Sequence, residues 1–232
     1  MKEPTLKEYD NQNLLMEMLA EQIATELKIC LKKKNSVTLA VPGGSTPKPF
    51  FNKLSEIKLD WGRVVVVPTD ERFVPETNIR SNLGLIKKNL LQNQAIGASV
   101  VRFFKSDCTP EELSFHIASK LKSILPIDIC ILGMGSDMHI ASIFPGADNI
   151  KNALDIKSSQ TIVPITEPKK NEMRLTLTAR VLREAPKIHF LLSGLDKRVA
   201  FNNALKAKDN WEIAPIRSVL YGQSSVTIHY AD

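Results

Sequence analysis

The sequence has few cysteines and no long apolar run. Its three cysteines, Cys30, Cys108 and Cys130, are odd in number and far apart among 232 residues. This pattern argues against a disulfide scaffold and favours reduced thiols in the cytoplasm. No apolar stretch approaches the length of a membrane span, and the polar residues 1–4 do not resemble a signal peptide. The sequence therefore predicts a cytoplasmic globular protein that does not bind a membrane.

Several motifs of known chemistry are also absent. Gly133-x-Gly135 lacks the third glycine of a dinucleotide fingerprint, and residues 43–48 lack the Gly-Lys-Ser/Thr of a P-loop. The chain has no cysteine pair or His-x-x-x-His for zinc, and no Gly-x-Ser-x-Gly nucleophile elbow. We therefore expect a site that uses neither a metal nor a cofactor.

The positive charge of the chain is spread along the sequence and not gathered in one patch. The formal net charge is +6, with basic residues spread along the sequence. The densest run, residues 32–34, falls where a first helix should end, and cations there complement the helix dipole. We interpret that run as a solvated helix end and, because the other basic residues are dispersed, expect no nucleic-acid binding. A modest positive bias suits a small anionic substrate equally well.

Apolar periodicity predicts helices alternating with strands. Helical spacing marks helices over about residues 13–34, 83–91 and 109–125, the last beginning at the capping box Thr109-Pro110-Glu111-Glu112. Runs rich in β-branched and apolar residues predict strands, which cover residues 36–41, 63–68, 127–132, 160–165, 173–178, 188–192 and 225–230. Without a repeat or linker, this alternation predicts an α/β protein, a single domain over residues 1–232 with a mostly parallel sheet. It leaves a monomer or a small homo-oligomer open.

Four of the predicted strands end in polar loops. The loops begin after Val41, Val67, Leu132 and Leu192. Because the carboxyl ends of parallel strands meet at one edge of a sheet, we expect the polar side chains of these loops to converge. These side chains belong to Ser45, Thr46, Asp70, Glu71, Arg72, Asp137, His139 and Lys197.

Residues 43–46 and two basic side chains suit a phosphate group. Gly43-Gly44-Ser45-Thr46 precedes a predicted helix, so the loop offers N–H groups, two hydroxyls and the positive end of a dipole. Pro47 can start that helix, with Ser45 or Thr46 as its cap. Arg72 and Lys197 can add charge-assisted hydrogen bonds to phosphate oxygens.

One histidine in these loops can transfer protons near neutral pH. That residue is His139, which lies six positions after Gly133. The three other histidines, His116, His189 and His229, fall on a predicted helix or on predicted strands, and we interpret them as structural.

Together these segments resemble the glucosamine-6-phosphate isomerase/6-phosphogluconolactonase family. The matching segments come in the family's order: residues 43–47, 70–75 with Ser81-Asn82, 133–146, 174–178, and Ser193-Gly194-x-x-Lys197. The resemblance implies a Rossmann-like sheet with helices on both faces and a phosphate held by residues 43–46 and basic side chains. It also implies hydrolysis of 6-phospho-D-glucono-1,5-lactone in the oxidative pentose phosphate pathway. Deaminase members usually carry Asn-Glu where this chain has Ser142-Ile143-Phe144, which favours the lactonase.

The resemblance also suggests a role for each site residue. His139 is the expected general base for water, and Arg72 or loop N–H groups stabilise the oxyanion. Asp137 either orients the loop or caps it, while Asp70 and Glu71 position Arg72. The alternatives are a sugar-phosphate isomerase or deaminase with Asp70 as base, and a catalytically inactive sugar-phosphate-binding protein.

The chain departs from the family pattern at three positions. Met138 stands where the family has glycine, so a positive φ there would strain Met138 by about 1–2 kcal/mol. The alternative is an ordinary backbone conformation with Met138 packed inward. Asn78 and Arg80 also replace the usual polar residues, an aspartate being common at the second position.

Overall fold

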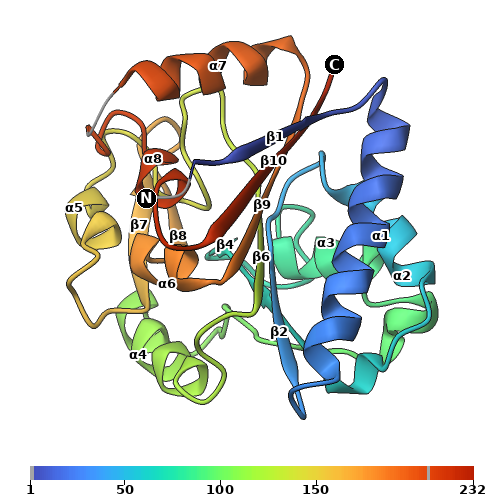
Figure 1. Cartoon of the computed structure of the whole chain (residues 1–232). Coiled ribbons are helices and arrows are strands. Elements are labelled where there is room, and N and C mark those ends of the chain that lie inside the picture. Colours follow the sequence, from blue (N-terminus) through green and yellow to red (C-terminus); the bar gives the residue numbers. More distant parts are fainter. Residues whose placement is uncertain (1–2, 208–209) are drawn as a thin grey trace.

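A parallel sheet of seven strands runs through the centre of the molecule (Figure 1). The computed structural model describes residues 3–207 and 210–232. The strand order is β1-β10-β9-β6-β2-β3-β5, and every neighbouring pair is parallel. The bounds of the strands are Thr5–Glu8 for β1, Val37–Val41 for β2, Val64–Pro68 for β3, Ser99–Val100 for β5, Ile129–Leu132 for β6, Lys187–Ser193 for β9 and Ser225–Ala231 for β10.

A second, antiparallel sheet of three strands has the order β4-β8-β7. Its strands are β4 (Asp70–Arg72), β7 (Ile162–Glu167) and β8 (Glu172–Leu177). The strands predicted near residues 160–165 and 173–178 therefore exist, but they pair with each other and not with the parallel sheet. The connection of four residues between them is too short for a parallel crossover and fits a hairpin. Pairing of β4 with β8 places Arg72 opposite Arg174.

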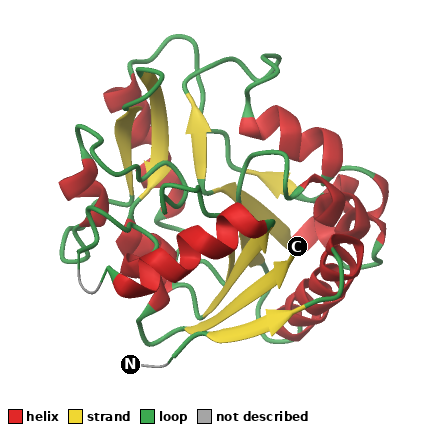
Figure 2. Cartoon of the chain, turned by 90° about the horizontal axis from the view of Figure 1, so that it is seen from above, coloured by secondary structure: helices red, strands yellow, loops and turns green. Residues whose placement is uncertain are grey.

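Helices cover both faces of the parallel sheet, as Figures 1 and 2 show. Helices α1, α2 and α3 lie on one face, and the remaining helices lie with the small sheet on the other. The helix bounds are Gln12–Leu31 for α1, Lys48–Glu56 for α2, Asn82–Asn89 for α3, Pro110–Leu121 for α4, Ile150–Leu154 for α5, Ala179–Glu184 for α6, Leu195–Lys206 for α7 and Arg217–Leu220 for α8, with short 3₁₀ helices at Trp61–Arg63 and Asn93–Gly97. Among the described residues, none of these helices combines the length and apolarity needed to cross a bilayer. The predicted α/β domain with a mostly parallel sheet is confirmed.

The cap and the apolar face of α1 determine where this helix begins and ends. Asn11 caps α1 by accepting the N–H of Leu14, and buried apolar residues recur along one face to Leu31. The helix therefore ends three residues earlier than predicted. Lys32 and Lys33 are exposed, as expected of a solvated helix end. Lys34 turns back instead and forms an ion pair with Asp128.

The predicted capping box of α4 is present. The Thr109 hydroxyl accepts the N–H of Glu112 at 3.2 Å, and the Glu112 carboxylate accepts the N–H of Thr109 at 2.9 Å. Each of these bonds satisfies an N–H group that a helix start leaves unpaired. Helix α4 consequently begins at Pro110, the position that the sequence predicts.

Candidate active site

Loops that follow four strands of the parallel sheet line one pocket. These loops come after β2, β3, β6 and β9, and the pocket has a volume of about 270 Å³. The strands bring their carboxyl ends to one edge of the sheet, so residues far apart in sequence meet there. The pocket is lined by eight of the nine site residues predicted from the sequence, Gly43, Gly44, Ser45, Thr46, Asp70, Arg72, His139 and Lys197. The ninth, Asp137, contacts the ring of His139.

The glycine pair after β2 allows the loop to approach its neighbours closely. Gly44 has a φ of +92°, a backbone conformation that glycine adopts without steric cost. A Cβ added to Gly43 would lie 1.9 Å from Oδ1 of Asn82, far inside van der Waals contact. Both glycines are therefore required for the shape of this wall of the pocket.

The hydroxyl side chains that follow do not cap α2, so that prediction is wrong. The N-cap residue is Pro47, and no side chain forms a cap hydrogen bond. Pro47 itself has helical backbone angles, with φ −78° and ψ −8°, so the turn begins before the first helical residue. The hydroxyls of Ser45 and Thr46 line the pocket and are available to a ligand there.

His139 and Asp137 form a hydrogen-bonded pair in the loop after β6. Nδ1 of His139 lies 2.5 Å from Oδ1 of Asp137, and the ring packs against Phe144 with centroids 4.3 Å apart. Burial alone would raise the pKa of Asp137, but the hydrogen bond and charge of His139 lower it to about 2. The carboxylate therefore stays ionised and holds the Nδ1 proton, which leaves Nε2 as the acceptor nitrogen. Asp137 thus orients the imidazole, a role that the sequence does not predict, and its Oδ1 atom also accepts the backbone N–H of His139 at 3.4 Å within the loop that it is expected to orient or cap.

Met138 adopts the strained alternative considered from the sequence. Its φ is +66°, in the left-handed region that glycine prefers. Its N–H donates to the carbonyl of Gly135, and its carbonyl accepts the N–H of Ile216, so the tight turn is held from both sides. The side chain also packs, half-buried, against the core. The backbone therefore follows the strained alternative, and of the second alternative only the inward packing of the side chain is present.

The side chain of Arg72 is held by an amide and a carbonyl. Its NH1 atom donates to Oδ1 of Asn82 in a short hydrogen bond and to the carbonyl oxygen of Arg80 at 3.1 Å. The contact of Glu71 with Arg72 is to its backbone N–H and not to its side chain. The other hydrogen bonds of the Glu71 carboxylate are to the start of α3. Burial raises the pKa of Glu71, and these hydrogen bonds oppose that rise. Glu71 thus fixes the backbone around Arg72, and Asn82 orients the guanidinium.

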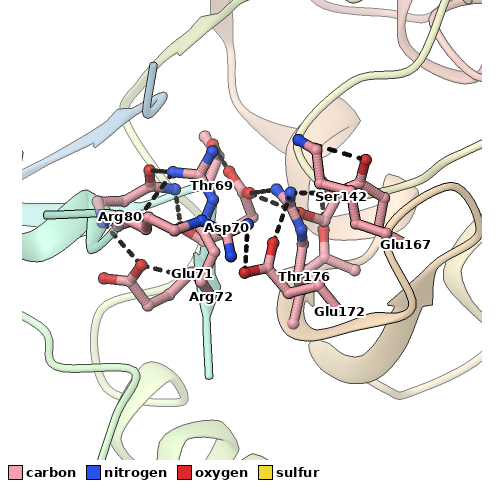
Figure 3. Close-up of polar contacts among 12 residues, drawn as sticks. Thr69, Asp70, Glu71, Arg72, Arg80, Ser142, Glu167, Glu172 and Thr176 are labelled. Atoms are coloured by element: carbon pink, nitrogen blue, oxygen red, sulfur yellow. Dashed lines mark hydrogen bonds and ion pairs between the residues drawn. The ribbon is translucent and has the colours of Figure 1, made fainter. Parts of the chain in front are cut away.

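Asp70 acts on Arg72 through its backbone and not through its carboxylate: its carbonyl oxygen accepts a hydrogen bond of 2.8 Å from Nδ2 of Asn82, the amide that orients Arg72. The Oδ2 atom of Asp70 accepts a hydrogen bond of 2.5 Å from the Ser142 hydroxyl, and its Oδ1 atom accepts one of 3.1 Å from Thr69 (Figure 3). Asp70 and Arg72 are two residues apart on β4 and therefore share one face of the strand, on which both line the pocket, while Glu71 faces the other side. The same Oδ2 atom of Asp70 lies 3.9 Å from NH1 of Arg174, so Asp70 belongs to a group of ionic contacts around that residue of β8.

Arg174 is the centre of that group and lines the pocket. It is 5% exposed, and its NH2 atom pairs with Glu167 and, at 2.9 Å, with Glu172. Its NH1 atom lies 3.9 Å from Oδ2 of Asp70. Glu172 also pairs with Arg80 at 2.5 Å (Figure 3). A buried guanidinium surrounded by carboxylates is held in one orientation toward the pocket.

The sequence reasoning gave no role to Arg174, Asn82 or Ser193, all of which line the pocket. All three stand in the segments that resemble the family, but the strand-end rule did not select them. Arg174 lies within a strand of the second sheet, and Asn82 lies in the first turn of α3. A charged residue inside an alternating apolar strand was the one signal that could have identified Arg174.

The basic side chains outnumber the carboxylates among the residues that line the pocket. Arg72, Arg174 and Lys197 carry positive charge, and Asp70 carries the negative charge. Lys197 comes from α7 and lies 3.5 Å from the exposed Asp196. The site is therefore suited to an anion that reaches Lys197 and the two arginines from the solvent side.

Comparisons with known proteins identify the family of the chain. A family model described as glucosamine-6-phosphate isomerases/6-phosphogluconolactonase matches residues 10–228. The chain belongs to this family. All the residues that line the pocket fall within the matched range.

Relatives named 6-phosphogluconolactonase resemble the chain over most of its length. The protein of Mesorhizobium japonicum is 39% identical over 87% of this chain and 84% of its own, and that of Rhizobium meliloti is 36% identical over 91% of both. The crystal structure of a 6-phosphogluconolactonase from Shewanella baltica is 30% identical, with a TM-score of 0.95 over 100% of this chain and 99% of the other. The similarity therefore extends to the whole fold.

Proposed function

We propose that the chain hydrolyses 6-phospho-D-glucono-1,5-lactone to 6-phosphogluconate, with water activated by His139. The observation that carries the proposal is the His139–Asp137 pair in a pocket lined by Arg72, Arg174 and Lys197. It combines a proton acceptor with positive charge for an anionic substrate. The family relationship and the names of the relatives support the same reaction.

In this mechanism one proton moves to His139 and back. Nε2 of His139 takes a proton from water as the water oxygen attacks the lactone carbonyl carbon. Arg72, which Asn82 and the carbonyl of Arg80 hold in place, stabilises the oxyanion that forms. The bond between the carbonyl carbon and the ring oxygen then breaks, and the imidazolium returns the proton to that oxygen. Asp137 stabilises the charged ring between the two transfers.

The phosphate of the substrate lies, in this proposal, between residues 43–46 and Lys197. Ser45 and Thr46 line the pocket beside the glycine pair, and Lys197 lines it from the first turn of α7. Hydroxyls and an ammonium group together provide the donors that phosphate oxygens require.

An assay with two substrates tests the reaction. The purified protein should accelerate acid release from freshly generated 6-phosphogluconolactone beyond a control without enzyme, and should release no ammonia from glucosamine 6-phosphate. A deaminase would need Asp70 as base, yet both oxygens of Asp70 already accept hydrogen bonds from hydroxyls. Ammonia release, or binding of both compounds without turnover, would contradict the proposal.

The phosphate site can be tested at Lys197. Replacing Lys197 with Met should weaken binding of 6-phosphogluconate by about 1.5–3 kcal/mol, roughly 10- to 150-fold in Kd, because one charged hydrogen bond is lost. Binding of unphosphorylated gluconate should hardly change. Calorimetry with both ligands measures this, and Lys206→Met on the same helix is the matched control. An equal loss for both ligands would mean that Lys197 does not contact the phosphate.

The proposal includes a setting for the enzyme. We place it in the cytoplasm, acting on a small sugar phosphate without nucleic acid, as a monomer or a small homo-oligomer. The three cysteines are unpaired thiols, and Cys130 is buried. Reduced thiols are the usual state of cysteine in a cytoplasm.

A further inference from the structure

The buried guanidinium of Arg174 faces more negative than positive charge. Glu167 and Glu172 pair with its NH2 atom, and Asp70 lies 3.9 Å from its NH1 atom. Three carboxylates around one guanidinium would cancel its charge and leave a net negative field on that side of the pocket. An anionic substrate would then be repelled where Arg174 lines the pocket.

Arg80 supplies one of the missing positive charges. Its NH2 atom lies 2.5 Å from Oε1 of Glu172, whose Oε2 atom is 2.9 Å from Arg174 (Figure 3). Glu172 therefore stands between two guanidiniums, one exposed and one buried. Lys170 forms a weaker ion pair with Glu167. Its Nζ atom lies 3.7 Å from Oε1 of Glu167, and its side chain is largely exposed.

The backbone of Arg80 is held by hydrogen bonds and also contacts Arg72, the other arginine that lines the pocket. The N–H of Arg80 donates to Oδ1 of Asn78, and the N–H of Ser81 donates to the carbonyl oxygen of the same residue. The carbonyl oxygen of Arg80 accepts a bond from Arg72. One residue thus reaches Arg72 through its backbone and Arg174 through its side chain and Glu172.

We propose that Arg80 is a positioning and specificity-determining residue, which neutralises Glu172 so that the charge of Arg174 acts on the phosphorylated substrate. The inference rests on the proposed function, since it takes a phosphorylated sugar as the anion in the pocket. Arg80 acts through Glu172 and Arg174 and does not take part in proton transfer. Its contribution is therefore expected in substrate affinity and not in the rate of the chemical step.

The test measures the effect of the Arg80 side chain on the KM, first with Glu172 present and then with Glu172 replaced. Arg80→Gln should raise the KM for 6-phosphogluconolactone about two- to fivefold, the range that a partly exposed ion pair gives. The kcat, and the KM for unphosphorylated glucono-1,5-lactone, should stay unchanged. Arg80→Lys, which keeps the charge, should restore most of the affinity.

The decisive comparison is a double-mutant cycle with Glu172→Gln. In the Glu172→Gln background the further change Arg80→Gln should leave the KM unaltered, because no carboxylate remains to be neutralised. Lys87→Gln is the matched control. It removes a lysine that pairs with Glu76 in the same segment but does not contact Glu172, so it should not change the KM.

Three results would overturn the proposal. They are an equal KM rise in both backgrounds, an equal loss for the phosphorylated and unphosphorylated lactones, and no change in the Arg80→Gln variant. Failure of the proposed function is distinguishable, because the wild-type protein would then not accelerate lactone hydrolysis. In that case the affinities for 6-phosphogluconate and gluconate, measured by calorimetry on the same variants, still test Arg80.

Discussion

Two regions of the molecule each pair a histidine with a carboxylate, and only one of them lines the pocket. Nδ1 of His139 is 2.5 Å from Asp137, and Nε2 of His189 is 3.0 Å from Glu26. The side chain of His139 is 28% exposed, whereas that of His189 is 3% exposed. The contacts of the second ring nitrogen distinguish the two pairs.

In the buried pair every ring nitrogen has a partner. His189 Nδ1 lies 3.1 Å from Nε2 of His229, whose Nδ1 lies 2.8 Å from the hydroxyl of Tyr9. With both rings neutral, Tyr9 donates to His229, His229 donates to His189, and His189 donates to Glu26. Burial would raise the pKa of Glu26, but the hydrogen bond of His189, and the charge that His189 carries when it is protonated, lower it.

A histidine–carboxylate pair is therefore insufficient for proton transfer. A site also needs a second nitrogen that a substrate or water can reach, and His139 in the pocket meets that requirement. The network around His189 has used all its nitrogens to satisfy buried polar groups, so its expected role is in stability.

The largest test of this contrast exchanges each histidine for asparagine. His139→Asn should lower kcat by about 10²- to 10⁴-fold with little change in KM, since asparagine cannot take up a proton. His189→Asn should leave kcat unchanged and lower the free energy of unfolding by about 1–3 kcal/mol, because it disturbs a buried hydrogen bond. Single-turnover rates and thermal melts on the same preparations separate the two effects. A destabilised but fully active His139→Asn protein would contradict the catalytic assignment.

A smaller effect concerns the dependence of stability on pH. Burial, followed by the charges of His189 and Lys7, lowers the pKa of His229 from 6.5 to about 3, against an opposing effect of Glu26. Between these values the unfolded chain binds a proton that the folded protein does not. Stability is therefore complete above pH 6.5 and falls as the pH decreases. The expected loss from His229 is about 2 kcal/mol between pH 6.5 and 5.

Urea unfolding at pH 7.5 and pH 5 measures this loss. The variant His229→Gln should show a smaller difference between the two pH values, and His116→Gln, which changes an exposed histidine on α4, should keep the wild-type difference. Equal differences in all three proteins would mean that His229 is not the group responsible.

The sequence predicts the elements best where one local pattern determines them. The apolar run of β3 and the capping box of α4 identify their elements, because burial on both faces and a helix start leave local signatures. Strand β1 was not predicted, since all four of its residues are exposed and it lies at the edge of the sheet beside β10. Strand β5 has two residues, too few for a periodic pattern.

The site was predictable as far as strand ends determine it. The rule that parallel strands end at one edge selects His139 and Lys197 without any contact being known. The rule does not predict which residues from distant segments contact one another at the site. Ser142 bonds Asp70 from 72 positions away, and Arg174 reaches the pocket through the pairing of β8 with β4. Such contacts depend on the hairpin forming a second sheet, which no local pattern encodes.

The smallest test alters one end of the buried network. The hydroxyl of Tyr9 donates to Nδ1 of His229, so Tyr9→Phe removes the donor and leaves a buried acceptor. Tyr9 itself is half-buried, so water can replace part of the lost bond, and the expected cost is about 1 kcal/mol of unfolding free energy. A protein of this length should then melt about 2–4 °C lower. The kcat and KM for the lactone should stay at the wild-type values, because the network does not line the pocket. A loss of turnover with an unchanged melting temperature would instead connect the buried histidines to the chemistry, and the contrast between the two regions would be wrong.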